Sequence, residues 1–422
     1  MAHDTEQQKR SLDEWLSWME QCHPADIELG LDRVRQVSER LAINLSASQV
    51  VTIGGTNGKG STVRYLQTLY SGAGYSVGCY TSPHFLYYNE RVELNGQPVS
   101  DQQLCDAFTA IDQARGEIQL TYFEFGTLAA LLIFSQTQPD LVLLEVGLGG
   151  RLDAVNIIDP DIAVITTVAL DHQEWLGDTR EAIGFEKAGI FRSGKPAVCG
   201  DPDLPESVLK HAHDMNTPLY RAGIEFGIRC HETQCEFTGQ DQFGQPVSLQ
   251  QIPQPELPLP NAATALQVSQ LLPLNISAAQ QRDGIAQARL TGRMQRVSYQ
   301  GINFCLDVAH NPEAAGLLAQ RLVHWDKPIL VLGMLKDKDR ARVIETLLPV
   351  VAEWHLVDLE PPRGGTAAEL AGYLPADIKP YQHATVSDAI NDLVRSKKPL
   401  QDVMIAGSFY TVAEALNVLK RD

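Results

Sequence analysis

The stretch Val-Val-Thr-Ile-Gly-Gly-Thr-Asn-Gly-Lys-Gly-Ser at residues 50–61 decides the fold of the chain. Apolar and β-branched residues lead into four glycines, and apolar residues then recur at helical spacing from Thr62 to Ser71. This order predicts a strand, a glycine loop and a helix. Glycines let backbone N–H groups converge, while the helix N-terminus and Lys59 add positive charge. The stretch therefore predicts a polyphosphate site, where the Ser61 hydroxyl is available to a magnesium ion that bridges the phosphates.

The spacing departs from the usual phosphate loop, because Gly54 comes one residue late and Gly60 separates Lys59 from Ser61. A tight turn with a solvated lysine is the alternative, although four glycines would weaken an ordinary turn. As it stands, the stretch resembles the variant phosphate loop of the Mur ligase superfamily, which couples ATP to amide-bond formation. The resemblance assigns nucleotide contacts to Gly55, Thr56, Asn57, Gly58, Lys59, Gly60 and Ser61.

Composition describes an ordinary globular protein of two or three domains, with 422 residues of which 44% are hydrophobic and 20% charged. The longest apolar run, Leu128 to Phe134, is too short to cross a bilayer, and the polar N-terminus lacks the apolar segment of a signal peptide. We therefore expect a cytoplasmic protein without a membrane partner, and we predict that it is a monomer.

A net charge of −18 makes nucleic acid an improbable partner, since binding to phosphate backbones needs a basic face. An anionic substrate must then be attracted locally, by Lys59, arginines, helix ends and metal. The seven cysteines show no disulfide framework. Cys230 and Cys235 resemble half of a zinc site, but no second pair has matching spacing, so we expect thiols.

Continuous apolar strands at Tyr75–Tyr80, Leu141–Val146 and Asp161–Val168 predict a parallel sheet covered on both faces. Ligands of such sheets gather beyond the carboxyl ends of the strands. Three polar residues lie at or just past these ends and should approach the phosphate loop: Ser82, Glu145 and His172. Carboxylate and hydroxyl oxygens suit magnesium, whereas His172 alone is equally well interpreted as a polar residue that caps a loop.

The fold class expected is α/β with two doubly wound domains. Residues 1–295 form an ATP-binding domain with the phosphate loop and a small antiparallel sheet at 224–252, where short alternating runs are separated by glycine turns. Strands and helices alternate again over residues 296–422, which predicts a C-terminal Rossmann-like domain. We expect the two domains to form a two-substrate site.

An ordered series of segments is similar to the folylpolyglutamate synthase family, and most similar to its bacterial members that also have dihydrofolate synthase activity. The similarity extends over nearly the whole chain. It rests on residues 55–61, 81–84, 122–124, 145–156, 170–172, 186–190, 260–263, 292–293, 307–312 and 407–411.

The resemblance implies that Ser82, Glu145 and His172 hold magnesium. It also implies that the amine of Lys187 carries a carboxyl group, whereas the helical pattern alone indicates a surface charge. Further positions implied to contact ATP are Asn261, Arg293 and Asp307. With Lys59 and Lys187, His310 is assigned to the catalytic group, in contact with substrate or phosphate.

The resemblance places pterin binding in three segments, Glu28-Leu29-Gly30-Leu31, Tyr122-Phe123-Glu124-Phe125 and Leu152-Asp153-Ala154. An aromatic pair with an adjacent acid suits a flat ring with hydrogen-bonding edges, although a pair of core aromatics and a plain interhelical turn are the alternatives. The expected function is an ATP- and magnesium-dependent ligase that adds L-glutamate to dihydropteroate and further glutamates to folates. Two alternatives remain: an enzyme with only the tail-extending activity, and a binding module switched by nucleotide.

Overall fold

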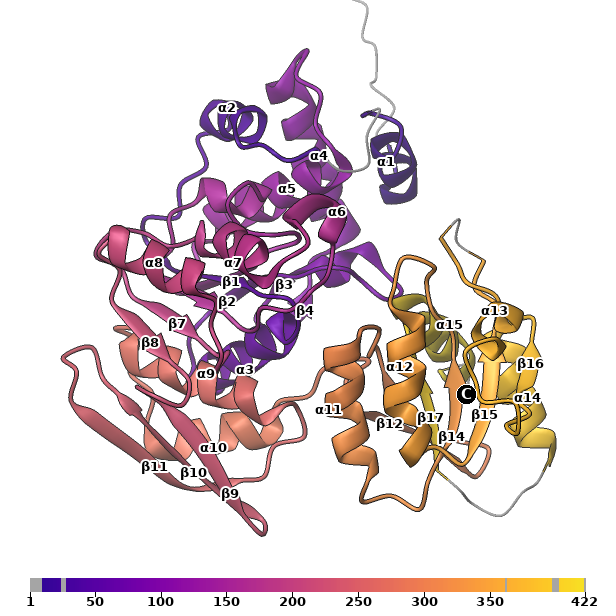
Figure 1. Ribbon diagram of the computed structural model, residues 1–422. Helices are drawn as coiled ribbons and strands as arrows, with labels where there is room; N and C mark the ends of the chain where they lie inside the picture. Colours follow the sequence, from indigo (N-terminus) through magenta and orange to yellow (C-terminus); the bar gives the residue numbers. More distant parts are fainter. Residues whose placement is uncertain (1–9, 24–27, 361–362, 397–401, 421–422) are drawn as a thin grey trace, which may run out of the picture. The chain divides into compact units, whose positions relative to one another are not determined.

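The computed structural model describes residues 10–23, 28–360, 363–396 and 402–420. Contacts group the chain into two compact units (Figure 1). Unit 1 holds the described residues up to His84 and from Tyr88 to Ala288, and unit 2 holds Phe85–Tyr87 and the described residues from Arg289 onward. Each unit is built on a sheet of its own.

Unit 1 contains an eight-stranded sheet with the order β4-β3-β2-β5-β1-β6-β7-β8. Strands β2, β5, β1, β6, β7 and β8 are parallel, and β3 and β4 extend the β2 edge as an antiparallel hairpin. The bounds are β1 Gln49–Gly54, β2 Val77–Tyr80, β3 Val92–Leu94, β4 Gln97–Pro98, β5 Leu141–Glu145, β6 Ile162–Ile165, β7 Ala197–Cys199 and β8 Leu219–Arg221.

The strands β1, β2, β5 and β6 are buried almost throughout, which explains their unbroken apolar sequences. Two long apolar helices, α5 and α9, are also buried along most of their lengths. The helices of unit 1 are α1 Leu12–Met19, α2 Asp32–Arg40, α3 Lys59–Gly72, α4 Asp101–Arg115, α5 Tyr122–Thr137, α6 Gln173–Leu176, α7 Arg180–Ala188, α8 Glu206–Asp214, α9 Leu259–Leu271 and α10 Ala278–Gln287, with 3₁₀ turns Tyr88–Arg91 and Ala154–Ile157.

A separate three-stranded antiparallel sheet also belongs to unit 1, with β9 Gly227–His231, β10 Gln234–Gln240 and β11 Pro246–Pro253 in the order β11-β10-β9. It confirms the small sheet predicted from the alternating runs. Cys230 and Cys235 are directly opposite each other in β9 and β10 and form a disulfide. The expectation of thiols at these two positions was wrong, because the tight hairpin makes them cross-strand partners. The other five cysteines are free thiols.

Unit 2 contains a six-stranded sheet with the order β12-β13-β17-β14-β15-β16, parallel except for the antiparallel edge strand β12. Its strands are β12 Gln295–Tyr299, β13 Ile302–Asp307, β14 Ile329–Leu332, β15 Glu353–Val357, β16 Tyr381–His383 and β17 Val403–Ala406. Its helices are α11 Pro312–Leu322, α12 Arg340–Leu347, α13 Ala367–Ala371, α14 Val386–Ser396 and α15 Phe409–Leu419, with a 3₁₀ turn Leu348–Val350.

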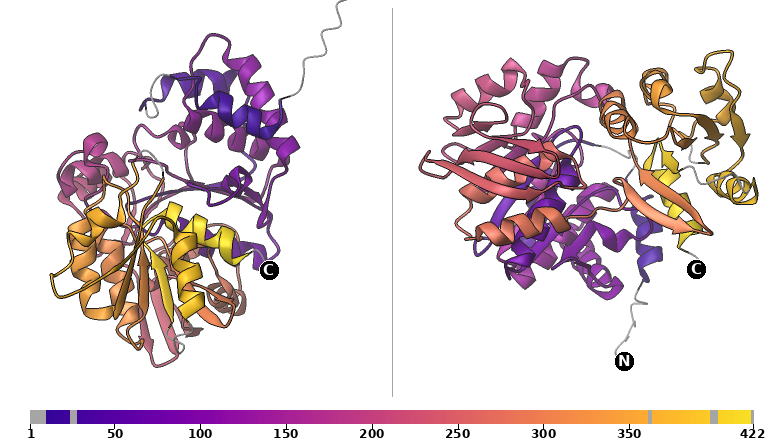
Figure 2. Two further views of the ribbon diagram at one scale, coloured as in Figure 1. Left: turned by 90° about the vertical axis from the view of Figure 1, so that its right-hand side faces the viewer. Right: turned by 90° about the horizontal axis from the view of Figure 1, so that it is seen from below.

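The sheet of unit 2 separates two cores, and successive residues of one strand face opposite ones. In β14, Leu330 packs with α11, α12 and α13, whereas Val331 packs with α14 and α15. Figure 2 shows the orange helices α11 and α12 and the yellow helices α14 and α15 on opposite sides of this sheet. The prediction of a second doubly wound sheet is therefore confirmed, as is the α/β class.

None of the helices in the described ranges has the length and apolar character that crossing a lipid bilayer requires.

Candidate active site

The glycine loop joins β1 directly to α3, as the sequence predicts. Gly58 precedes the first residue of α3 and has a φ of +88°. The Lys59 ammonium group folds back over the loop and donates to the carbonyl oxygens of Gly55, at 3.0 Å, and Thr56, at 3.3 Å. The Ser61 hydroxyl in the first turn of α3 is buried and has no hydrogen-bond partner among the described residues. A buried hydroxyl without a hydrogen-bond partner is unfavourable, because it has lost its contacts with water. A metal ion bound here would supply the missing partner.

The segment after β6 braces the loop. The Thr56 N–H donates to the carbonyl oxygen of Thr167 at 2.8 Å, and the Asn57 N–H donates to the Thr167 hydroxyl at 3.1 Å. The Thr166 hydroxyl in turn donates to the carbonyl oxygen of Asn57 at 2.6 Å. These bonds fix the loop to the segment that continues to His172.

Asn261, the predicted ATP contact on α9, lies against the same loop. Its amide nitrogen donates to the Thr62 hydroxyl at 3.2 Å, and a Cβ atom added to Gly58 would lie only 2.3 Å from that nitrogen. Glycine is therefore required at position 58 for two reasons, its positive φ and the close approach of Asn261.

We expect Gly58→Ala to lose about 1–2 kcal/mol to backbone strain and a further 1–3 kcal/mol to crowding, and to bind ATP more weakly. Gly74→Ala is the matched control, because Gly74 has a φ of +93° but no atom within 4 Å of the added Cβ. Urea unfolding and calorimetric titration with ATP measure the two effects. Equal losses of unfolding free energy in the two variants would show that crowding against Asn261 does not contribute to the effect of Gly58→Ala.

The three predicted metal ligands follow parallel strands of the eight-stranded sheet. Ser82 comes after β2, Glu145 ends β5, and His172 comes after β6, which β1 separates from β5. Glu145, the last residue of β5, pairs in register with Ile53 of β1, and its carboxylate accepts a hydrogen bond from the Ser82 N–H at 3.2 Å. His172 is the N-cap residue of α6, with a φ of +51°, and its side chain is 45% exposed. Ser82 and His172 line the same cavity. Ser82 thus lies close to both Glu145 and His172. Their approach to the phosphate loop and their role as metal ligands stay predictions.

This cavity has a volume of about 260 Å³. It brings together all three segments predicted for pterin binding, through Glu28, Leu29, Gly30, Phe123, Glu124, Leu152, Asp153 and Ala154. Three predicted residues do not line it: Leu31, Tyr122 and Phe125. Leu31 precedes α2, the Tyr122 ring contacts the Arg91 guanidinium, and Phe125 is fully buried in the core against Trp18. The remaining lining comes from Pro83, Arg91, Thr121, Gly147 and Leu148. Of these, Pro83, Gly147 and Leu148 lie in segments that carry the family resemblance but were given no role, and Arg91 and Thr121 were not singled out from the sequence.

Phe123 forms a flat apolar wall of the cavity. A Cβ atom on Gly147 would lie 2.5 Å from its ring, so the ring packs directly on this glycine. Arg91 supplies a positive charge and donates from Nε to Nδ1 of His84 at 2.9 Å. Burial, followed by the charge of Arg91, lowers the pKa of His84 to about 4. A planar ring and an anionic group are both suited to this lining.

Arg33, another residue missed from the sequence, ties the first segment to the second. Its guanidinium contacts the Glu28 carboxylate, donates to the Glu28 carbonyl oxygen at 3.0 Å, and donates to Oε1 of Glu124 at 2.9 Å. The second carboxylate oxygen of Glu124 accepts the Thr121 N–H at 2.8 Å in the capping box of α5. Glu124 therefore has a structural task besides lining the cavity.

Asp153 is the buried carboxylate of the third segment. It accepts the N–H groups of Leu148, at 2.8 Å, and Val155, at 3.1 Å, and so shapes the turn after β5. Burial raises the pKa of Asp153 to about 6, although these backbone hydrogen bonds oppose the shift.

Lys187 is only 3% exposed on α7, so the helical pattern was wrong in indicating a surface charge. Its helix packs against the turn after β5, where a Cβ atom on Gly150 would lie 2.9 Å from the carbonyl oxygens of Glu186 and Lys187. The Arg151 N–H donates to that Glu186 oxygen at 2.8 Å. Burial of a lysine in this way demands compensation by partners or by chemical change of the amine.

The remaining predicted residues gather in unit 2. Asp307 ends β13, and its carboxylate accepts the N–H groups of Met294, at 3.1 Å, and Ala309, at 3.0 Å. Burial raises the pKa of Asp307, against the opposing charge of Arg293. The guanidinium of Arg293 lies 5.5 Å from the centroid of the Phe409 ring, and the His310 ring lies 6.4 Å from that centroid. The contacts of Arg293 and Asp307 with ATP, and of His310 with substrate or phosphate, stay predictions.

Two families of Mur ligase domains match most of the chain. The Mur ligase middle domain family matches residues 53–253, and the family described as Mur ligase, glutamate ligase domain matches residues 292–409. The dihydrofolate synthase/folylpolyglutamate synthase of Escherichia coli K12 is 44% identical over 418 residues, which cover 98% of this chain and 97% of that protein.

Two solved structures are also similar over nearly the whole chain. Escherichia coli FolC in complex with DHPP and ADP has 44% identity and a TM-score of 0.90, covering 97% of this chain and 98% of that one. The bifunctional folylpolyglutamate synthase/dihydrofolate synthase of Yersinia pestis with AMPPNP and Mn ion has 43% identity and a TM-score of 0.90, with the same coverage. The chain therefore belongs to the dihydrofolate synthase/folylpolyglutamate synthase family of Mur ligases.

Proposed function

We propose that this chain is an ATP-dependent ligase that adds L-glutamate to dihydropteroate and then extends folates with further glutamates. The observation that carries the proposal is a single sheet edge that presents the phosphate loop together with a cavity lined by Phe123, Arg91 and Asp153. A nucleotide site alone would serve a switched binding module. A neighbouring cavity with these lining residues instead suits an enzyme, because it provides a binding site for the carboxylic acid that ATP activates.

Amide formation needs a better electrophile than a carboxylate. In the proposed reaction a carboxylate oxygen of the acid attacks the γ-phosphorus of ATP, ADP leaves, and an acyl phosphate forms. The amine nitrogen of L-glutamate then attacks the carbonyl carbon of the acyl phosphate, and inorganic phosphate leaves. Lys59 would hold and neutralise the phosphates, while the cavity would orient the acid.

We propose Mg²⁺ as the metal, held by Ser61, Ser82, Glu145 and His172. When bound, it would neutralise phosphate charge. The buried hydroxyl of Ser61 and the oxygen atoms at the ends of β2 and β5 favour a hard cation here. Removal of divalent metal by a chelator should stop ADP release, and Mg²⁺ should restore it.

In unit 2 we propose that Arg293 and Asp307 contact ATP and that His310 contacts substrate or phosphate. The ATP-binding domain would comprise residues 1–295 and the ligase domain residues 296–422. That the enzyme acts as a monomer in the cytoplasm stays a prediction from the sequence.

Release of ADP from ATP tests the function. We expect release in the presence of Mg²⁺ to require both L-glutamate and a pterin acid, with dihydropteroate and with a reduced folate alike. Activity with folate but not with dihydropteroate would establish the tail-extending enzyme instead. Release that depends on neither substrate would contradict a ligase.

The affinity for dihydropteroate should fall below about pH 6, because Asp153 then gains a proton. Loss of its charge weakens the bonds from Leu148 and Val155 that shape the cavity wall. With the pKa near 6, the ionised fraction and the affinity should both fall about tenfold from pH 7 to pH 5. Calorimetric titration of dihydropteroate measures this change. Asp153→Asn should bind dihydropteroate weakly at both pH values. If this variant showed the same fall in affinity between pH 7 and pH 5 as the wild type, the pH dependence would arise from another group.

A further inference from the structure

A second group of chemically reactive side chains lies in unit 2, at the β16 edge of its sheet. His355 of β15, His383 of β16 and Asp392 of α14 each offer one ligand atom, and these atoms all lie within 4.8 Å of one another. We propose that these three side chains bind a divalent transition-metal ion of the zinc type, at a site that the proposed ligase reaction does not use. Two imidazoles and a carboxylate form a donor set that suits such an ion.

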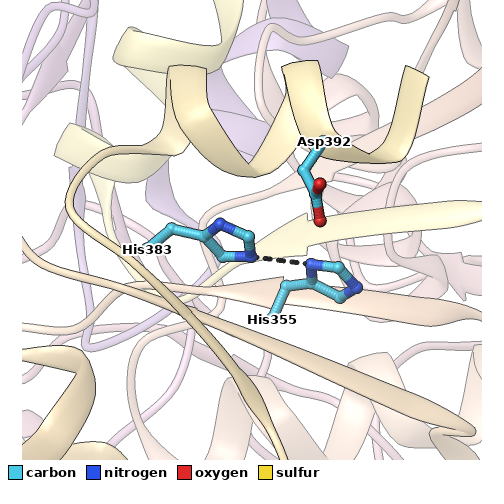
Figure 3. A group of neighbouring side chains, drawn as sticks. All are labelled: His355, His383 and Asp392. Carbon is cyan, nitrogen blue, oxygen red and sulfur yellow. Dashed lines mark hydrogen bonds between the residues drawn. The ribbon is translucent and has the colours of Figure 1, made fainter. Parts of the chain in front are cut away.

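The fold itself creates the convergence. His355 pairs with Tyr381 in the parallel ladder of β15 and β16, so His383, two residues beyond Tyr381, lies on the same face of the sheet. Helix α14 covers this face, and Figure 3 shows Asp392 directed from the helix toward both imidazoles. The three donors therefore come from three separate elements.

Glu353 determines which ring nitrogen of the buried His355 carries the hydrogen atom. Nε2 of His355 lies 2.9 Å from the Glu353 carboxylate, which accepts hydrogen bonds but donates none when ionised. Nε2 therefore carries the hydrogen atom and Nδ1 presents its lone pair to His383. Metal-binding histidines typically donate their other ring N–H to a carboxylate, which orients the ring and increases the basicity of the ligand nitrogen.

The distances are close to those that a metal needs. Nδ1 of His355 and Nε2 of His383 are 2.9 Å apart. Two nitrogens bound to one tetrahedral zinc ion would be about 3.3 Å apart. A shift of a few tenths of an ångström opens this contact, and the exposed side chain of Asp392 is able to complete the set. The hydrogen on His383 Nε2 would move to its Nδ1, so binding requires no net loss of a proton from the pair.

A metal here would have a structural effect. The three-residue strand β16 forms the edge of the sheet, and among the described strands β15 alone pairs with it. Coordination would attach β16 to β15 and to α14 at once. Such a cross-link would raise the stability of unit 2 with increasing metal concentration.

Cobalt(II), a coloured substitute for zinc, tests the site in the full chain without a histidine tag. Excess Mg²⁺ occupies the proposed nucleotide site. We expect one cobalt ion per chain, with visible absorption of a nitrogen- and oxygen-ligated ion. His383→Gln and Asp392→Asn should each weaken binding at least about 10–100-fold. His324→Gln, at an exposed histidine of the same unit, should bind like the wild type.

Absence of magnesium-resistant cobalt binding, or equal affinity in the wild type and the two ligand variants, would overturn the proposal. A crystal of the wild-type protein soaked in zinc chloride gives a second measurement that does not depend on variant folding. Anomalous density at the zinc edge should appear between His355, His383 and Asp392. Density confined to other positions, or none at all, would show the pair to be an ordinary hydrogen-bonded contact.

Discussion

Lys59→Ala is expected to lower kcat of the ligase reaction at least about 1000-fold while leaving the fold intact. The Lys59 ammonium group contacts the carbonyl oxygens of Gly55 and Thr56 and belongs to the loop that we propose to hold the phosphates. Its removal takes away a full positive charge where negative charge develops during transfer of the γ-phosphoryl group. Alanine favours helix, so the first turn of α3 should remain.

Steady-state ADP release and circular dichroism separate these two effects. Lys210→Ala is the matched control, because that lysine is 75% exposed on α8 and pairs with Asp214 in the next turn. We expect this control to retain its rate. A Lys59→Ala enzyme within about tenfold of the wild-type kcat would exclude Lys59 from the mechanism.

Lys187→Ala should lower kcat about 100–1000-fold, and short-chain carboxylic acids should restore part of it. The side chain is 3% exposed on a helix packed against the turn after β5, so alanine leaves a polar cavity near the end of that strand. If the amine carries a carboxyl group, acetate or propionate is able to enter this cavity and replace the lost negative charge. The native protein should then be heavier by one carbon dioxide in gentle intact-mass measurement.

The control for rescue is Lys195→Ala, at a half-exposed lysine paired with Asp161. Its rate should not respond to added acids. An unmodified lysine mass, together with no rescue of Lys187→Ala, would contradict carboxylation. The loss of rate would then come from the buried side chain itself.

The phosphate loop was predictable because its strand, glycines, lysine and helix are adjacent in the sequence. The parallel sheet was predictable because strands buried on both faces leave continuous apolar runs. This also placed Ser82 and Glu145 together, since neighbouring parallel strands end at the same edge. The hairpin of β3 and β4 was not predicted, because β4 is only two exposed residues, Gln97 and Pro98.

The cavity was only partly predictable. Arg33 and Arg91 carry no local signal, since their importance arises from partners that the fold brings from distant segments. Phe125 shows the opposite error, since it was predicted to bind the pterin but does not line the cavity. Phe123 and Glu124 of α5 line the cavity, whereas the next residue, Phe125, points into the core. Lys187 is charged and follows the charged Glu186, yet the small residues after β5 allow its helix to approach closely and cover it.

The contact between Gly58 and Asn261 implies a rule for how such chains diverge. With 2.3 Å between the amide nitrogen and the space a methyl group would fill, position 58 is not free to enlarge alone. A larger residue at position 58 should therefore occur in related chains only together with a smaller residue at position 261. Two positions that are far apart in the sequence would then change together during evolution.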